Sequence, residues 1–322
     1  MPRDNGTSKK GRDKQNKDKD KKNADQDNKK NKGRKAAAMV VEPEKVVGDG
    51  SPKPDYPRYR VRPGERIRLK DIDPEESESY DSKEETLPLL QRELVRIDAL
   101  QERLFAEGKQ SLLIVLQAMD TGGKDGTIRG VFEGVNPQGC HVWGFKAPTP
   151  EELAHDFLWR IHAKTPGRGM ITIFNRSHYE DVLVVRVHEL VPEEVWKKRY
   201  EAINDWERTV HESGTVILKF YLHISKDEQK KRLEDRRDTP EKRWKFRSTD
   251  LGERAYWDSY MEAYEDALNE CSTDYAPWYA IPANKKWYRN LVIARIIADT
   301  LEAMDPQFPQ PEEGIEKVVV PD

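Results

Sequence analysis

The residues best suited to chemistry lie between Ala118 and Thr127, where glycines surround a single lysine. This stretch reads AMDTGGKDGT and begins one residue after the unbroken apolar run Leu112–Leu116. Glycine adopts backbone geometries that other residues resist, so successive N–H groups can point at one anion while the Lys124 ammonium adds a full positive charge. The pattern predicts a phosphate-binding loop in which phosphate or nucleotide is contacted by Lys124 and by Thr121, Gly122, Gly123, Asp125, Gly126 and Thr127.

The loop departs from the standard pattern G-x-x-x-x-G-K-[ST] at two positions. Ala118 replaces the first glycine, and Asp125 stands where a metal-binding hydroxyl is expected, although Thr127 could supply a hydroxyl two residues later. Asp120 adds a carboxylate that would repel phosphates unless a divalent cation lay between them, so we expect Mg²⁺, or Mn²⁺ in its place, at Asp120. The alternative is an ordinary glycine-rich turn with a solvated lysine.

A second polar segment follows the apolar run at residues 169–174 and reads NRSHYED from Asn175 to Asp181. Polar groups at the carboxyl ends of buried parallel strands lie at the ligand-binding edge of an α/β sheet. An acidic residue usually holds Mg²⁺ at this position, and Asn175 takes its place here. Arg176 is suited to bidentate phosphate binding, and Glu180 or Asp181 could restore the missing negative charge. A helix N-cap with acidic first-turn residues is a compatible alternative.

A strongly basic segment follows the predicted strand at residues 215–224 and includes Arg236, Lys242 and Lys245. In a phosphate-loop protein, a basic segment after a strand is typical of a mobile lid that closes over the transferred phosphate and excludes water. We expect this lid at about residues 226–250. A charged run is more often a solvated face, an interpretation that we retain for most of these residues but not for Arg236.

Hydrophobic spacing predicts the elements that must position these groups. We expect strands at residues 112–116, 140–145, 169–174, 215–224 and 279–282, and amphipathic helices at 82–106, 193–212 and 285–303. A further helix should begin at residues 148–152 and carry His155, Arg160 and His162. Buried strands that alternate with amphipathic helices predict an α/β fold with a parallel sheet.

The composition indicates that part of the chain lies outside this fold. Charged residues make up 36% of the 322 residues, and hydrophobic residues also make up 36%. Residues 1–35 contain 14 Lys or Arg and 6 Asp, a net charge of +8 in a chain whose total is −3. We expect a disordered basic arm and linker at 1–55, a folded domain at 56–304 and a loose tail at 305–322. The arm either attracts a polyanion or is a solubilising tail.

The sequence shows neither an apolar run of about 20 residues nor a signal-peptide core, so we expect a cytoplasmic protein that does not enter a membrane. Its two cysteines, Cys140 and Cys271, are too few for a disulfide framework and lie in no zinc-finger spacing. Both are interpreted as small core residues.

From about Tyr59 to Glu302 the chain resembles the polyphosphate kinase 2 family. The segments that carry the resemblance are Met119–Thr127, Phe174–Asp181, Arg236–Phe246, Ala276–Trp278 and Asn284–Trp287. The first two resemble the class III subgroup, whose single-domain enzymes accept both AMP and ADP. The resemblance implies a P-loop kinase-like fold similar to that of thymidylate kinase, with helices on the sheet and a helical lid.

The same resemblance implies roles for four residues. Asp120 would position Mg²⁺ and phosphate, Lys124 and Arg176 would bind phosphate, and Arg236 of the lid would stabilise charge in the transition state. Asn175 departs from the aspartate of many relatives, a change that Glu180 could compensate. The basic arm lies outside the family pattern.

The implied reaction is a Mg²⁺-dependent phosphoryl transfer between inorganic polyphosphate and nucleotides, from AMP to ADP and from ADP to ATP, favouring nucleotide synthesis. A basic groove would bind the polyanion, with candidates Arg129, Lys164, Lys242, Lys245 and Lys285. We expect a homo-oligomer and do not expect nucleic acid as a partner. The alternatives are an ATP-dependent nucleotide kinase, or a polyanion- or nucleic-acid-binding protein with an inactive phosphate loop.

Overall fold

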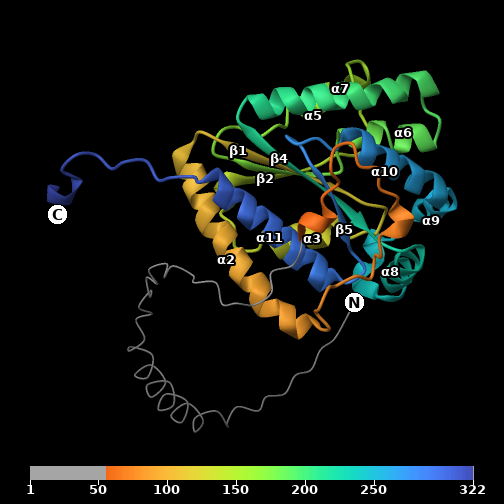
Figure 1. Cartoon of the computed structure of the whole chain (residues 1–322), viewed down its shortest axis with the longest axis horizontal. Coiled ribbons are helices and arrows are strands. Elements are labelled where there is room, and N and C mark those ends of the chain that lie inside the picture. The colour runs from red at the N-terminus through yellow and green to blue at the C-terminus, as the bar shows by residue number, and fades with distance from the viewer. Residues whose placement is uncertain (1–55, 322) are drawn as a thin grey trace, which may run out of the picture. The chain divides into compact units, whose positions relative to one another are not determined.

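Five parallel strands form the sheet on which the predicted loops are mounted (Figure 1). The computed structural model describes residues 56–321. The strands are β1 (Ser111–Gln117), β2 (Cys140–Gly144), β3 (Ile171–Asn175), β4 (Thr215–His223) and β5 (Trp278–Pro282). They lie in the order β2-β3-β1-β4-β5, and each neighbouring pair is parallel. The five predicted strands and the parallel α/β architecture are confirmed.

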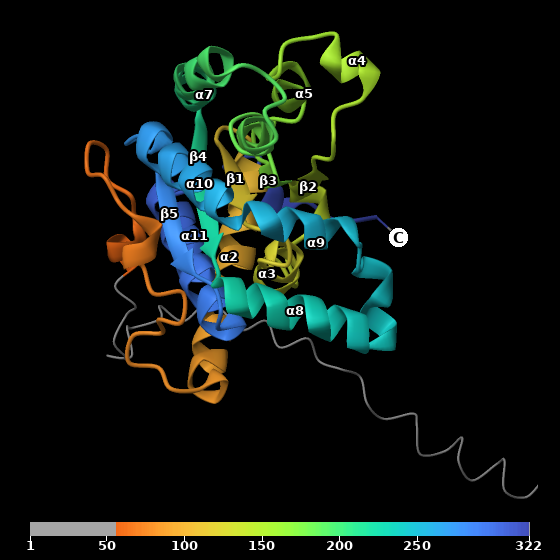
Figure 2. The same ribbon diagram turned by 90° about the vertical axis from the view of Figure 1, so that its right-hand side faces the viewer.

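Helices cover both faces of the sheet (Figures 1 and 2). One face carries α2 (Lys83–Glu107), α3 (Lys124–Val131) and α11 (Lys286–Met304), and the other carries α6 (Val184–Val187), α7 (Glu193–Glu212) and α10 (Trp257–Cys271). The remaining α-helices of the described chain are α4 (Pro150–Leu153), α5 (Trp159–His162), α8 (Lys226–Asp238) and α9 (Thr249–Glu253). Because both faces are covered, every residue of the central strand β1 is buried.

The two long predicted helices on either side of the sheet are confirmed. In α2, the Ser82 hydroxyl accepts a hydrogen bond from the backbone N–H of Glu85, and Gly108 ends the helix with φ of 62°. Its buried residues include Leu94, Ile97 and Leu104, which recur at helical spacing. In α7 the buried residues include Trp196, Tyr200, Ile203 and Trp206, which also recur at helical spacing.

The prediction of one helix carrying His155, Arg160 and His162 is wrong. A capping box between Thr149 and Glu152 starts α4 as expected, but the helix ends after one turn. The Asp156 carboxylate then accepts a hydrogen bond from the backbone N–H of Leu158, which starts a separate turn before α5. Residues 257–271 form α10, a helix that was not predicted from the sequence.

The amino-terminal part of the described chain covers the outer edge of β5. The backbone N–H of Val61 donates to the carbonyl of Trp278 at 2.8 Å, and Arg60 forms an antiparallel bridge with Tyr279. 3₁₀-helices lie at Tyr56–Tyr59, Leu69–Asp71, Pro137–Gly139, His178–Asp181 (η4), Pro240–Lys245 (η5), Arg254–Tyr256 and Ile315–Lys317.

The segment predicted as a lid is helical and lies beyond the carboxyl end of β4, where Figure 2 shows α8 and α9 facing the viewer. Its two ends are joined, because Arg254 donates to the Lys226 carbonyl at 2.9 Å and to the Gln229 side chain at 2.7 Å.

Residues 307–321 are largely exposed. The expected arm at 1–55 lies outside the described residues. Within those residues, no helix has the length and apolar content needed to cross a membrane.

Candidate active site

The phosphate loop joins β1 to α3 and keeps the lysine ammonium inside the protein. Lys124 is buried, and its Nζ donates a hydrogen bond to the Ala118 carbonyl at 2.7 Å. Thr121 and Gly123 both have positive φ, at 63° and 109°. A Cβ on Gly122 would lie 2.4 Å from the Cβ of Ala118, so only glycine fits this turn. The Thr121 hydroxyl is buried without a hydrogen-bond partner among the described residues, and it is therefore free for a ligand.

The charge of Lys124 is set by its surroundings. Burial, followed by the neighbouring Arg176 guanidinium, lowers the pKa of Lys124 to about 8. The carboxylates of Asp120, Glu180 and Asp125 oppose this change. Desolvation disfavours the charged form of a lysine, and nearby negative charge favours it. A phosphate bound in the loop would therefore strengthen the protonated state.

Asp120 and Arg176 are brought together from two neighbouring strands. Arg176 Nη2 lies 2.7 Å from Asp120 Oδ1, and the Arg176 backbone N–H donates to the Leu116 carbonyl at 3.1 Å. Burial alone would lower the pKa of Arg176, but the charges of Glu180 and Asp120 outweigh it and raise the pKa. Arg176 has φ of 64°, a left-handed conformation that is uncommon for a residue with a side chain. Such strain is often found where a side chain is held in a particular direction for function.

Asn175 and the two acidic residues after it have separate positions. Asn175 donates from Nδ2 to Asp125 Oδ1 at 2.8 Å, which ties the end of β3 to the first turn of α3. Glu180 acts electrostatically on both Lys124 and Arg176. Asp181 pairs instead with Arg199 of α7, 3.0 Å away. Of the two acids proposed to compensate for Asn175, Glu180 is therefore the one directed at the site.

The lid residues approach the loop to different extents. Lys245 Nζ is 4.0 Å from Asp125 Oδ2, whereas Lys242 is paired with Asp235 within the lid at 2.7 Å. Burial, and then the charge of Asp120, raise the pKa of Asp250, while Arg236 opposes the rise. The half-buried Arg236 therefore lies close enough to Asp250 to act on its charge.

The other predicted groove cations do not form one continuous surface. Lys164 Nζ lies 4.1 Å from the ring centre of Trp143 on β2, at one edge of the sheet. Lys285 donates to the Ser77 hydroxyl at 2.8 Å and precedes α11, which follows β5 at the opposite edge. Arg129 is exposed in the last turn of α3. The structure therefore separates these residues.

Arg232 and Gln229 of α8 are site residues that the sequence analysis missed. Arg232 is buried and donates to the carbonyls of Thr121 and Gly122 at 3.1 and 3.0 Å, and to those of Ala283 and Asn284 at 2.7 and 3.0 Å. Gln229 donates to the Asp120 carbonyl at 3.1 Å. These bonds fix the loop to the lid base and to the start of α11. In the sequence, Arg232 is one of several basic residues in a run, and nothing in that run distinguishes a buried arginine from a solvated one.

A buried ionic network supports the segment that carries Arg176. Lys219 of β4 donates to the Tyr179 hydroxyl at 2.8 Å and pairs with Glu207 of α7. Glu207 Oε1 also accepts from the Tyr179 hydroxyl at 2.9 Å and contacts His178 Nε2 at 3.2 Å. Burial would raise the pKa of Glu207, but the charge of Lys219 and the bond to His178 lower it. The network therefore holds η4, which begins two residues after Arg176, against the core.

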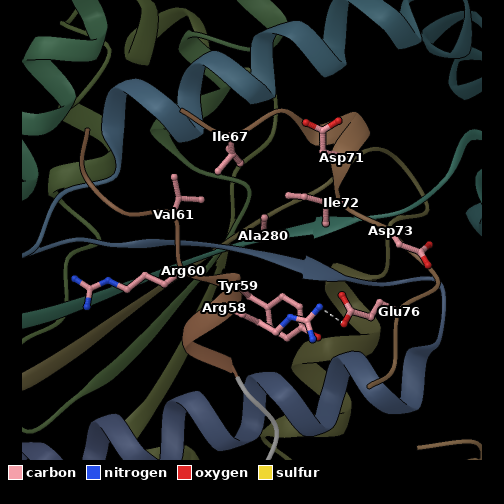
Figure 3. A pocket seen from close by; sticks show the side chains of 10 residues that line it. All are labelled: Arg58, Tyr59, Arg60, Val61, Ile67, Asp71, Ile72, Asp73, Glu76 and Ala280. Atoms are coloured by element: carbon pink, nitrogen blue, oxygen red, sulfur yellow. Dashed lines mark ion pairs between the residues drawn. The ribbon is translucent and has the colours of Figure 1, made fainter. Parts of the chain in front are cut away.

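A cavity among the described residues lies away from this loop. It has a volume of about 390 Å³ and is lined by side chains from within residues 58–76 and by Ala280 of β5 (Figure 3). An ion pair between Arg58 and Glu76 crosses its lower side in the figure. None of the predicted site residues lines it. The candidate active site is therefore the phosphate loop and not this cavity.

The carboxylates near the loop suit a metal ion that also binds substrate phosphates. Within residues 56–321 no group of three or more His, Cys, Asp or Glu side chains could hold a metal ion. Asp120 could supply one carboxylate oxygen beside the loop, with Glu180 close enough to influence the same charges. Mg²⁺ keeps several waters and binds through one or two carboxylates together with substrate phosphates. The residues present fit such an ion.

The chain is similar to known proteins over most of its length. Residues 77–309 match the family model described as polyphosphate kinase 2. The AMP/ADP-polyphosphate phosphotransferase of Meiothermus ruber is 56% identical over 267 residues, which cover 82% of this chain and 99% of that protein. The ADP-polyphosphate phosphotransferase of Rhodopseudomonas palustris is 46% identical and covers 79% and 92%. A crystal structure of polyphosphate kinase 2 from Arthrobacter aurescens superposes with a TM-score of 0.77 at 45% identity, over 80% of this chain and 93% of that one.

Proposed function

Because this chain belongs to the polyphosphate kinase 2 family, we propose that it transfers phosphoryl groups between inorganic polyphosphate and adenosine phosphates, from AMP to ADP and from ADP to ATP. The observation that carries this function is the convergence of Lys124, Asp120 and Arg176 at one edge of the sheet. The Meiothermus ruber relative, named for both AMP and ADP, supports both acceptors. We further propose that the net direction is nucleotide synthesis in the cytoplasm, by a homo-oligomer.

The mechanism follows from charge and position. A terminal phosphate oxygen of AMP or ADP attacks the terminal phosphorus of polyphosphate, a new P–O bond forms, and the bond to the rest of the chain breaks. The shortened chain leaves with the electron pair of that bond. Phosphoryl transfer needs alignment and charge neutralisation more than a protein nucleophile. Lys124 and Arg176 supply fixed positive charge, and Asp120 orients the Arg176 guanidinium.

Lid closure would add Arg236 and exclude water, which would otherwise hydrolyse the transferred group. Lys245 of the lid lies beside Asp125, in the first turn of α3. When bound, Mg²⁺ would neutralise phosphate charge and align the reacting oxygens, with Asp120 as its protein ligand. Mn²⁺ prefers similar oxygen ligands and could replace it.

Asp120→Asn should lower both the affinity for Mg²⁺ and the rate of ATP formation. The amide keeps the size of the side chain but loses the charge that would hold Mg²⁺ and orient Arg176. We expect the rate of ATP formation at fixed Mg²⁺ to fall by about tenfold or more, with partial recovery at higher Mg²⁺. A Mg²⁺ titration of the wild-type protein and the variant tests this. An unchanged half-saturating Mg²⁺ concentration would remove Asp120 from the metal site.

The pH dependence should report the Lys124 ammonium. A lysine is charged below its pKa, so with a pKa of about 8 Lys124 loses its charge as the pH rises through 8. Because kcat/KM reports the free enzyme, we expect kcat/KM for polyphosphate to fall about tenfold per pH unit well above pH 8. Rates should be measured at constant ionic strength. Lys124→Arg, which stays charged, should lack this decline even if it is slower, and a decline shared by both proteins would assign it to another group.

The function itself is tested by luciferase detection of ATP. The full chain is mixed with Mg²⁺, long-chain polyphosphate and either AMP or ADP, without added ATP, beside a Lys124→Met control. ATP from both acceptors supports the proposal, and ATP from ADP alone removes AMP as an acceptor. Product only when ATP is supplied as donor would favour an ATP-dependent nucleotide kinase. Full turnover after deletion of residues 1–50 would exclude a function that depends on the basic arm.

A further inference from the structure

A second buried arginine lies against the first turn of α3, and no reaction step above uses it. Arg289 of α11 is 2% exposed. A Cβ on Gly123 would lie 2.0 Å from Arg289 Nη1, and a Cβ on Gly126 would lie 3.5 Å from Nη2. The glycines of the phosphate loop therefore leave room for a guanidinium as well as for phosphate. Gly130, one turn further along α3, leaves similar room for the Asn290 amide.

Arg289 carries a charge that the described chain does not neutralise. Its Nε and Nη2 donate to the neutral side chain of Asn290, at 3.1 and 2.8 Å, and Nη1 has no hydrogen-bond partner. None of the ion pairs formed within residues 56–321 includes it. Burial, and then the positive charge of Arg232, lower the pKa of Arg289 to about 9, so the guanidinium is still protonated at neutral pH.

The position is electrostatically unfavourable without an anion. A helix N-terminus carries partial positive charge, which repels a cation placed against it. Lys124 adds a further positive charge to the same loop, and Arg232, although paired with Glu228 at 2.7 Å, still lowers the pKa of Arg289. A buried charge normally has a partner of opposite sign, because removing it from water is costly. An anion in the phosphate loop would offset this repulsion, since interactions between charges are stronger inside a protein than in water.

We propose that Arg289 is a further binding residue of the phosphate loop, whose uncompensated buried charge lowers the stability of the free protein and is offset when polyphosphate binds. This inference rests on the proposed function, because it takes polyphosphate as the ligand. A glycine is then required at position 123 for two reasons: its positive φ, and the guanidinium of Arg289, which any larger residue would displace.

The test is polyphosphate binding in the absence of nucleotide, measured by calorimetry and by thermal unfolding. For Arg289→Met we expect the Kd for polyphosphate to rise about tenfold, which corresponds to 1.4 kcal/mol. The free variant should unfold at the same temperature as the wild-type protein or at a higher one, and polyphosphate should raise that temperature less. Arg289→Lys, which keeps a charge, should retain most of the affinity.

Arg295 is the matched control, because it is a second buried arginine of α11 but is paired with Glu93 at 3.0 Å. Arg295→Met should lower the unfolding temperature and leave the affinity for polyphosphate unchanged. Wild-type affinity in Arg289→Met would overturn the inference, as would equal losses of affinity in Arg289→Met and Arg289→Lys, which would indicate packing and not charge. A wild-type protein that neither binds polyphosphate nor forms ATP would reject the proposed function instead.

Discussion

Lys124→Met is expected to lower kcat/KM for ATP formation from ADP and polyphosphate by about 100- to 1,000-fold. The Lys124 ammonium is the buried cation inside the phosphate loop, held by the Ala118 carbonyl. Methionine has a similar length but no charge, so the variant tests electrostatics more than packing. Initial rates at several polyphosphate concentrations will separate the effect on kcat from that on KM. A larger effect on kcat would mean that the charge acts mainly in the transition state.

Lys197→Met is the control for this experiment. Lys197 is an exposed residue of α7 that pairs with Glu193 on the same helix, outside the site. We expect its activity to equal that of the wild-type protein. If Lys124→Met retained more than about a tenth of wild-type kcat/KM, the Lys124 ammonium would not be a main stabiliser of charge in the transition state.

Lys219→Met should have the largest effect on stability. It removes the buried ammonium that pairs with Glu207 and leaves this carboxylate fully buried beside Tyr179 and His178. Breaking one side of a buried ion pair costs about 3–5 kcal/mol of unfolding free energy. Urea denaturation of the variant measures this loss directly. Because the network holds η4 behind Arg176, kcat should also fall under conditions in which the variant is still folded.

The double variant Lys219→Met/Glu207→Leu separates the two contributions. It removes both charges, so most of the lost stability should return even though the native ion pair is absent. Failure to recover would show that Tyr179 and His178 need these charged groups as buried hydrogen-bond partners. Recovered stability with kcat still low would instead identify the Lys219–Glu207 pair as positioning residues for Arg176.

The sequence predicts those parts of the site that are local in the chain. The run from Leu112 to Leu116 and the glycines after it specify a buried strand and a loop, because each signal lies within a few residues. Asp120, Lys124, Arg176 and Glu180 all follow buried strands, and the parallel sheet brings them to one edge. Their catalytic and metal-binding roles stay predictions until the variants are measured.

The parts of the site that could not be predicted from the sequence depend on contacts between residues that are far apart in the chain. Arg232 is separated from Thr121 by 111 residues, and its burial becomes evident only when α8 packs against the loop. Arg289 lies in a helix whose periodicity was recognised, yet periodicity does not reveal a charged residue facing a glycine. The break between α4 and α5 was missed for a different reason. The local hydrogen bond from Leu158 to Asp156 competes with helix continuation, and a capping signal marks only where a helix begins.

The hydrogen bonds at the base of α8 limit which part of the lid can swing. Gln229 and Arg232 are fastened to the phosphate loop and to the start of α11, while Arg254 clamps the opposite end of the segment to the first turn of α8. These bonds hold the first half of α8 in place. If the predicted lid moves, we therefore expect only the stretch from about Arg236 to Asp250 to swing, while the loop beneath it keeps its conformation.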